Sequence, residues 1–515
     1  MTSIATGGLR GRAAAGTDRG GDGGDAGTPR LRANALTLWD STVLAVTSTA
    51  PTYSLASTMY LMVGAVGLAA PATILVSFLP VLGIAVAYAY LNRTNPDCGA
   101  SYSWLTQAIS PWLGWFTGWV QLMASLFFMV QAPILAAQNT LSFLSSLGVI
   151  PGDASANAWL VAGVGVAWLV IVTAIVVYGI GLTARFQWAM LAIEYLVLIL
   201  FSVLAFAKVA SQHPGSSTPF SWGWVNPFSI HGVEGLAAGA VLAVFFFWGW
   251  DAAANVNEET RDARVAPGQA GIVGMFLLLA IFLLSSSAMQ SLLPQGTIAN
   301  QGANALQYFA GQVLPAPWSY LMLLGLLSST IAVLQTTLLP AARVTLSMAR
   351  DGVWPAIFAR VNARFQTPLA GTIILSAICI VGLLLTTASP SVGATLSNLV
   401  NTIGVFIAFY YGITGIACAW YFRRILSHGV APLLFAGLLP LLGGLFLLVV
   451  GLLVVIQGQQ QNGWGYVLPV LVAFALGAPL TGVAWLGNRG YFAYRPVPYD
   501  PASGDDQPVG PAPLR

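Results

Sequence analysis

The sequence predicts an all-α polytopic membrane protein with twelve transmembrane helices, arranged as two inverted repeats of five helices followed by two more. Of its 515 residues, 57% are hydrophobic and only 7% are charged, whereas roughly a quarter of the residues in a soluble domain are charged. Twelve apolar stretches each come near the roughly 20 residues that a spanning helix needs. The first and the sixth stretch are both interrupted by residues that break helices.

The twelve stretches fall into two groups of five and a final pair. Because five is odd, the second group enters the membrane from the opposite side, which is the topology of an inverted repeat. We place the first repeat at 35–210, the second at 230–425 and the last two helices at 431–490. The stretches lie at about 36–66, 70–91, 112–145, 158–180, 184–208, 235–256, 268–292, 317–347, 369–388, 395–421, 431–456 and 464–487.

Both ends of the chain are predicted to be disordered, cytoplasmic tails. Residues 1–34 are rich in Gly, Ala, Arg and Asp, and residues 491–515 are rich in Pro, Gly and Asp. With the N-terminus inside, every one of the 19 Lys and Arg residues except Lys208 falls on the cytoplasmic side of a cell membrane. A charged cluster over 258–264 then lies in a cytoplasmic loop, which is either solvated or, alternatively, part of an inner gate.

Composition excludes several other classes of function. The net charge of +3 follows from membrane topology and gives no reason to expect nucleic acid as a partner. The three cysteines match no metal-binding spacing, and the three histidines fall in or near loops, so we expect no metal, no cofactor and no enzymatic site. The only lysine is Lys208, so the chain contains no Gly-Lys-Ser/Thr phosphate-binding loop for ATP.

The interruption of the first stretch, at 47–54, is expected to lie halfway through the membrane. Backbone groups freed by such a break must be buried in protein or face a wet cavity. The outer half-helix would begin after Ala50, with the partial positive charge of its N-terminus at mid-membrane. Pro51 suits the first turn of that helix, because no intrahelical N–H bond is made there. The candidate binding residues of this break are Thr49, Ala50, Pro51, Thr52 and Tyr53.

The interruption of the sixth stretch, at 248–251, occupies the matching place in the second repeat. Paired breaks of this kind are typical of the central binding site of a secondary transporter. An amino acid could place its carboxylate at the first helix start and its ammonium at the carbonyls freed here. Alternatively, Pro and Gly only kink the two helices, and Trp250 only packs. The candidate residues are Phe247, Trp248, Gly249, Trp250 and Asp251.

Two acidic residues fall inside apolar segments. Asp251, near mid-membrane, is expected either to cap the inner half-helix, worth about 1 kcal/mol, or to contact a substrate amine or a cation. Glu194 lies nine residues beyond Arg185, about 13.5 Å along a helix. Burial disfavours its charged form, so Glu194 is the candidate for proton coupling. Alternatively, it is a protonated residue bonded to a neighbouring helix carbonyl.

Three motifs give the chain a family resemblance. They are FFWGWD at 246–251 with NEET at 257–260, NPDCGASYSW at 95–104, and SMARDGVWP at 347–355. In these motifs the chain resembles the amino acid–polyamine–organocation permeases, over about residues 36–425. The resemblance implies the inverted-repeat fold of the sodium–leucine symporters and uptake of amino acids or amines, often with protons.

The chain departs from this family pattern at two places. Many members have a Gly-rich first break whose N–H groups hold a substrate carboxylate, whereas Pro51 has no N–H. Several proton-coupled members carry a Lys where Glu194 falls. We predict a permease in the lipid bilayer that takes up amino acids together with protons. The alternatives are a polyamine or organic-amine transporter and an amino acid exchanger, and a non-transporting sensor is favoured least.

Overall fold

The computed structural model describes residues 29–500, apart from 216, 231–238, 241, 245, 390, 392–393, 395–397 and 399–402. The described part of the chain is helical, and its only strand-like pairing is an isolated bridge between Leu36 and Thr260. Ten of its helical runs are long and apolar enough to cross a membrane. An all-α, multi-pass fold is therefore confirmed.

The helical runs match the predicted stretches closely. One run, Leu38–Thr94, contains the first two stretches, and the other nine runs each cover one. The sixth stretch, 235–256, includes residues outside the described part, so the count of twelve stays a prediction. The helices of the first half are α2 (Leu38–Ser48), α3 (Pro51–Val66), α4 (Ala70–Thr94), α5 (Ser101–Ala108), α6 (Pro111–Ser146), α7 (Ala158–Tyr178) and α8 (Ile180–Gln212).

The second half and the last helices follow in the same way. The second half contains α10 (Ala252–Asn255), α11 (Ala266–Leu292), α12 (Gln295–Gln301), α13 (Ala305–Val313), α14 (Leu321–Arg350), α15 (Leu369–Ala388) and α17 (Gly404–Tyr421). The chain ends with α18 (Val430–Pro432), α19 (Leu439–Asn462), α20 (Trp464–Ala475), α21 (Gly477–Gly487) and α22 (Arg489–Phe492).

Both predicted interruptions are present in the structure. The α2 helix ends at Ser48 and α3 begins at Pro51, with Ala50 between them in a left-handed conformation at φ 49°. Ahead of α10, residues 248–251 are not helical, and Gly249 has φ 110°. Pro51 and Gly249 explain the two breaks, because Pro lacks the N–H of a continuous helix and Gly tolerates positive φ.

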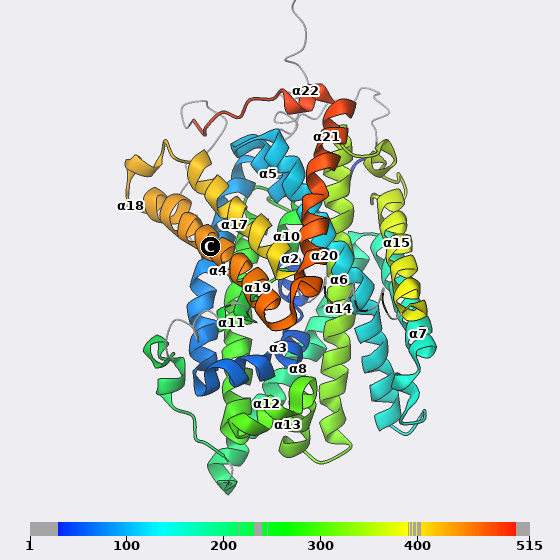
Figure 1. The fold of residues 1–515 in the computed structure, drawn as a ribbon, viewed down its shortest axis with the longest axis vertical. Helices are drawn as coiled ribbons and strands as arrows, with labels where there is room; N and C mark the ends of the chain where they lie inside the picture. The colour runs from blue at the N-terminus through cyan, green and yellow to red at the C-terminus, as the bar shows by residue number, and fades with distance from the viewer. Residues whose placement is uncertain are drawn as a thin grey trace, which may run out of the picture.

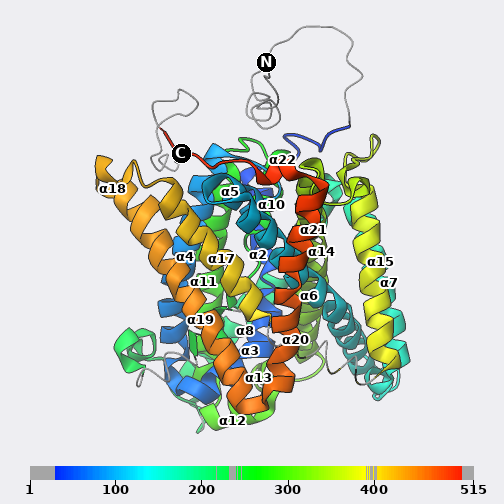
Figure 2. The same cartoon turned by 45° about the horizontal axis from the view of Figure 1, so that its top comes forward.

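The broken helices lie in the middle of the bundle. In both views α2, α3 and α10 are surrounded by longer helices, while α7 and α15 stand side by side at one edge (Figures 1 and 2). The helices α5 and α22 lie at one end of the bundle, and α12 and α13 lie at the other (Figure 1). We refer to these as the α5 end and the α12 end.

Residues from both predicted tails pack on the α5 end. The hydroxyls of Tyr491 and Thr106 are 2.7 Å apart. The backbone N–H of Tyr499 donates to the carbonyl of Tyr421 at 3.1 Å. Leu31 is buried in a small cluster with Cys98, Leu346 and Val361. Large apolar and aromatic side chains, which gain free energy by burial, hold these segments on the bundle.

The charged loop after α10 is buried at Glu259 and exposed at Arg261, Asp262 and Arg264, so it is solvated only in part. The Glu259 carboxylate and the Arg343 guanidinium are completely buried and 2.7 Å apart. Glu258 pairs with Arg350 at 2.9 Å. Because Arg343 and Arg350 both lie on α14, these pairs tie the loop to that helix at the α5 end. Because the Glu259–Arg343 pair is buried, loss of either partner would leave an unpaired charge out of water.

Candidate functional site

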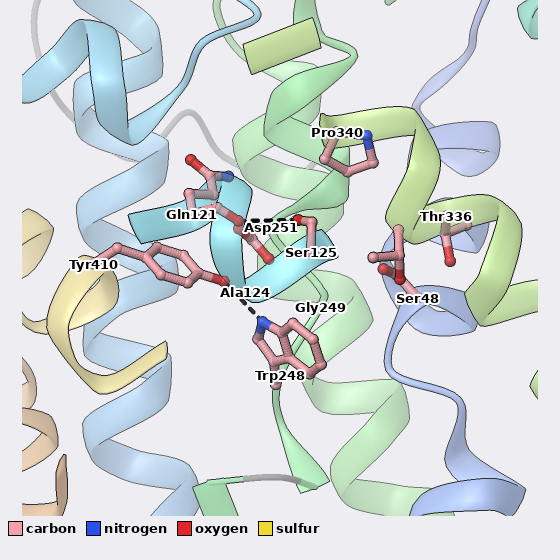
Figure 3. A pocket seen from close by; sticks show the side chains of 11 residues that line it. Ser48, Gln121, Ala124, Ser125, Trp248, Gly249, Asp251, Thr336, Pro340 and Tyr410 are labelled. Carbon is pink, nitrogen blue, oxygen red and sulfur yellow. Dashed lines mark hydrogen bonds between the residues drawn. The ribbon is translucent and has the colours of Figure 1, made fainter. Parts of the chain in front are cut away.

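A small, partly enclosed cavity lies where the two helix interruptions meet (Figure 3). Helices α2, α6, α14 and α17 form its walls together with the second interruption. Its described lining includes one acidic side chain and no basic one. The lining residues are Ser48, Gln121, Ala124, Ser125, Trp248, Gly249, Asp251, Thr336, Thr337, Pro340 and Tyr410.

The two interruptions touch each other at Gly249 and Ser48. A Cβ atom at position 249 would collide with the backbone carbonyl of Ser48, and φ at this residue is 110°. Only glycine fits both the conformation and the close approach. The contact brings the last turn of α2 against the second break, so both breaks contribute to one wall of the cavity.

Asp251 is the acidic group of this cavity. Its side chain is 5% exposed, and its Oδ1 accepts a hydrogen bond from the Tyr411 hydroxyl at 2.7 Å. Although Asp251 precedes α10, its side chain makes no capping hydrogen bond to that helix. No described basic side chain lies within ion-pair distance of it. A buried acid without a cationic partner or a capping role is suited to contact a ligand.

Trp248 lines the cavity, whereas its aromatic neighbours pack elsewhere. Its Nε1 donates to the Tyr410 hydroxyl at 2.8 Å, which orients the indole ring in Figure 3. Trp250 is 1% exposed and stacks on Tyr411, with ring centroids 5.4 Å apart. Phe247 packs on Phe282 at 5.7 Å. Packing is therefore the role that the contacts of Trp250 and Phe247 support.

The residues at the start of α3 face a different partner, Glu194. The Oε1 atom of Glu194 accepts the backbone N–H of Thr52 at 2.7 Å and the Ser329 hydroxyl at 2.6 Å. The Ser329 oxygen in turn accepts the backbone N–H of Tyr53 at 3.2 Å. Glu194 is completely buried, and its Oε2 has no hydrogen-bond partner among the described residues. Its carboxylate thus lies at a helix N-terminus, where the helix dipole favours negative charge.

The structure divides the ten predicted binding residues between two places. Trp248, Gly249 and Asp251 line the cavity. The remaining seven are not part of its lining. Five of them, at the first break, contact Glu194 or form the turn into α3, and the other two, Phe247 and Trp250, pack against other aromatic rings. The seven are Thr49, Ala50, Pro51, Thr52, Tyr53, Phe247 and Trp250.

Other cavity residues were not singled out from the sequence. Gln121 and Ser125 stand four residues apart on α6, and therefore on one face of that helix. Thr336 on α14 and Tyr410 on α17 complete the polar wall. A signal was available, because polar residues at helical spacing inside an apolar span mark a face that avoids lipid.

One cluster has the composition of a metal site. The potential ligand atoms of Asp97, Cys98 and Glu258 lie within 4.8 Å of one another. The Arg350 guanidinium, however, donates to both Glu258 oxygens, at 3.0 and 2.9 Å. Burial raises the pKa of the Cys98 thiol well above its usual value, which favours the protonated form that binds metals poorly. These contacts support a structural role for the cluster.

Comparison with known proteins identifies a family and several transporter relatives. The family model for amino acid permeases matches residues 36–476. The chain is 28% identical to the vacuolar cationic amino acid transporter 2 of Arabidopsis thaliana over 306 residues, which are 56% of this chain and 45% of the relative. It is 26% identical to the low-affinity putrescine importer PlaP of Escherichia coli K12 over 351 residues, 65% of this chain and 72% of the relative.

A third relative is the branched-chain amino acid permease BcaP of Bacillus subtilis. It is 24% identical over 307 residues, which are 58% of this chain and 63% of the relative. The chain thus spans less than half of the Arabidopsis relative, and its matches to the bacterial relatives cover more of their length.

Proposed function

Because the chain belongs to the amino acid permease family, we propose that it is a secondary transporter that moves amino acids or related amines across the cell membrane. The relatives described above are named for cationic amino acids, branched-chain amino acids and putrescine, all of which carry an amine. Transport, rather than catalysis, is the function that we assign to the cavity.

The cavity between the two breaks is the observation that carries this proposal. It combines a buried acid, an indole ring and several hydroxyl groups with the end of a broken helix. Asp251 suits an ammonium group, and the face of Trp248 suits a cation. Binding sites of secondary transporters lie at mid-membrane between discontinuous helices of two repeats, which is the arrangement that we propose for residues 35–210 and 230–425.

In the proposed mechanism the cavity opens alternately to the two sides of the membrane, and this alternation moves the substrate across. The breaks interrupt helical hydrogen bonding in both segments, so we propose that the segments on either side of each break move relative to the long helices α6 and α14. The ion pairs of Glu258 and Glu259 with α14 would hold the α5 end closed. We propose that they open when the cavity faces that end and re-form when it faces the α12 end.

We propose that Glu194 carries the coupling proton. Its two donors come from α3 in the first repeat and α14 in the second, and donation by Thr52 and Ser329 stabilises the charged carboxylate. If α3 moves away from α14, the carboxylate loses at least one donor while it stays buried. The neutral, protonated form is then favoured, which links proton uptake to the conformational change.

The positive charges support an orientation with the α5 end in the cytoplasm. Arg343, Arg350 and the loop Arg261–Arg264 lie at that end, whereas Lys208 donates to the carbonyl of Gln312 on α13, at the α12 end. By the positive-inside rule we place both termini in the cytoplasm and the α12 end outside.

Uptake into proteoliposomes tests this function. The purified protein is assayed with a panel of labelled amino acids and amines, with and without a proton gradient that is acidic outside. We expect saturable uptake that the gradient accelerates. Uptake only into vesicles preloaded with substrate would make the protein an exchanger, and no uptake of any member of the panel would contradict the proposal.

A further inference from the structure

We infer that Glu194 occupies, from within the protein, the place of a substrate carboxylate, so that the site takes an amine that lacks an α-carboxylate. This inference rests on the proposed transport function and narrows its substrate class. It assigns to Glu194 a role in specificity that is separate from any role in proton coupling.

The backbone N–H groups of the first break leave no donor for a bound carboxylate. Those of Thr49 and Ala50 donate to carbonyls of α2, at 3.1 Å each, and Pro51 has no N–H. The next donor, Thr52, is bound by Glu194, and Tyr53 is bound by Ser329. Ser54 donates to the carbonyl of Ala50 at 2.8 Å. Every backbone N–H from residue 49 to residue 54 is therefore already in use, and the only side-chain donor here without a partner among the described residues is the Thr52 hydroxyl.

The electrostatics of the cavity lead to the same conclusion. The partial positive charge at the start of α3 is met by the Glu194 carboxylate, so it cannot also balance a ligand carboxylate. On the other side of the break, the C-terminal end of α2 reaches the cavity at Ser48 and presents partial negative charge. Asp251 adds a negative charge, and no basic residue stands in the described lining. A carboxylate placed here would meet the negative charge of Asp251 and no positive side chain of the described lining.

An ammonium group, in contrast, finds several partners in the cavity. Asp251 offers its carboxylate, of which one oxygen is already oriented by Tyr411. The hydroxyl oxygens of Ser48, Ser125 and Tyr410 are further acceptors, and Trp248 offers its ring face. The observed groups recognise a protonated amine without requiring a second, anionic group on the ligand.

Matched pairs of ligands test this inference, because the two members of each pair differ only in the α-carboxylate. Cadaverine is compared with lysine and agmatine with arginine, as labelled substrates in proteoliposomes of the full chain. We expect the amine of each pair to be taken up at least tenfold more efficiently, as uptake rate divided by half-saturating concentration. An equal or greater efficiency for the amino acids would overturn the inference and leave the transport function in place. No uptake of any of the four would also overturn the inference, whereas the transport function is decided by the full panel described above.

Two variants at one position show whether Glu194 is the cause. Glu194→Ala frees the N–H of Thr52 and removes the internal carboxylate, so the affinity ratio of lysine to cadaverine should rise at least tenfold. Glu194→Gln keeps an oxygen in the same place and should retain most of the discrimination. Equilibrium binding by the detergent-purified proteins is measured, because binding does not require proton coupling. An unchanged ratio in a folded Glu194→Ala protein would contradict the role of Glu194. If that variant does not fold, the matched pairs on the natural chain still decide the substrate class.

Discussion

The carboxylate of Glu194 on α8 accepts the backbone N–H of Thr52 on α3 at 2.7 Å, across 142 residues of sequence. Ser329 on α14 donates to the same oxygen, so one buried acid joins three helices at the broken first segment. The protonation state of this single group therefore affects how α3 is held. This contact links the two functions that we assign to the site, specificity for the ligand and coupling to protons.

Replacement of Glu194 by glutamine should abolish uptake driven by a proton gradient and leave substrate exchange intact. Glutamine keeps an acceptor oxygen for Thr52 and Ser329, but its side-chain amide does not bind or release a proton near neutral pH. The measurement is uptake with and without an acidic exterior, alongside exchange in preloaded vesicles. Gradient-dependent uptake in the variant would remove Glu194 from the coupling mechanism.

Replacement of Asp251 by asparagine should weaken the binding of amine ligands about tenfold, which corresponds to about 1.4 kcal/mol. The substitution removes the negative charge in the cavity and keeps an oxygen for the Tyr411 hydroxyl. Equilibrium binding measures the effect, and Tyr411→Phe is the control that removes the hydrogen bond but keeps the charge. Equal affinities for Asp251→Asn and the natural protein would leave Asp251 without a role in binding.

Replacement of Gly249 by alanine should abolish ligand binding by pushing the two breaks apart. The residue has φ 110°, and a Cβ atom there would collide with the Ser48 carbonyl. We expect a destabilisation of about 1–3 kcal/mol from the backbone strain. Binding and thermal unfolding in detergent are compared with Gly163→Ala on α7, where a Cβ would meet nothing within 4 Å. Normal binding by Gly249→Ala would show that the contact with Ser48 is dispensable.

Replacement of Arg343 by methionine should destabilise the protein by about 3–5 kcal/mol, because Glu259 is left as an unpaired buried charge. The additional change Glu259→Leu removes that charge and should restore most of the stability. Thermal unfolding of the single and double variants measures the difference. A double variant that is no more stable than Arg343→Met would show that the pair is not what stabilises this end.

Much of the fold follows from the sequence, since membrane spans are encoded in length and apolarity alone. The two breaks were predicted because Pro51 lacks the N–H of a continuous helix and Gly249 disfavours a helical conformation. The direction in which α3 leaves its break was not predicted. It depends on the left-handed conformation of Ala50, and an alanine in the sequence does not predict that conformation. The start of α3 therefore meets Glu194 and Ser329, and its residues do not line the cavity.

The residues of α6 and α14 that line the cavity were not predicted, because their hydroxyl groups form bonds that are common in any membrane helix. Ser125, Thr336 and Thr337 each donate to a carbonyl four residues earlier in their own helix. Hydroxyl residues in membrane helices commonly form this bond, so a single one does not indicate a site, and only polar residues at helical spacing, such as Gln121 and Ser125, carry a signal. The ion pair of Glu259 with Arg343 was not predicted either, because positive residues are common at the cytoplasmic ends of membrane helices and the sequence does not single out Arg343.

The central claim, that the cavity between the breaks binds the substrate, is tested most directly by substrate protection of a cysteine at Ser125. The three native cysteines are buried and do not line the cavity, whereas Ser125 does. A small cationic methanethiosulfonate reagent should therefore modify Ser125→Cys selectively, and the natural chain is the control. We predict that a saturating concentration of a transported amine slows this modification at least tenfold. A rate that the transported amine does not change would contradict the assignment of the cavity.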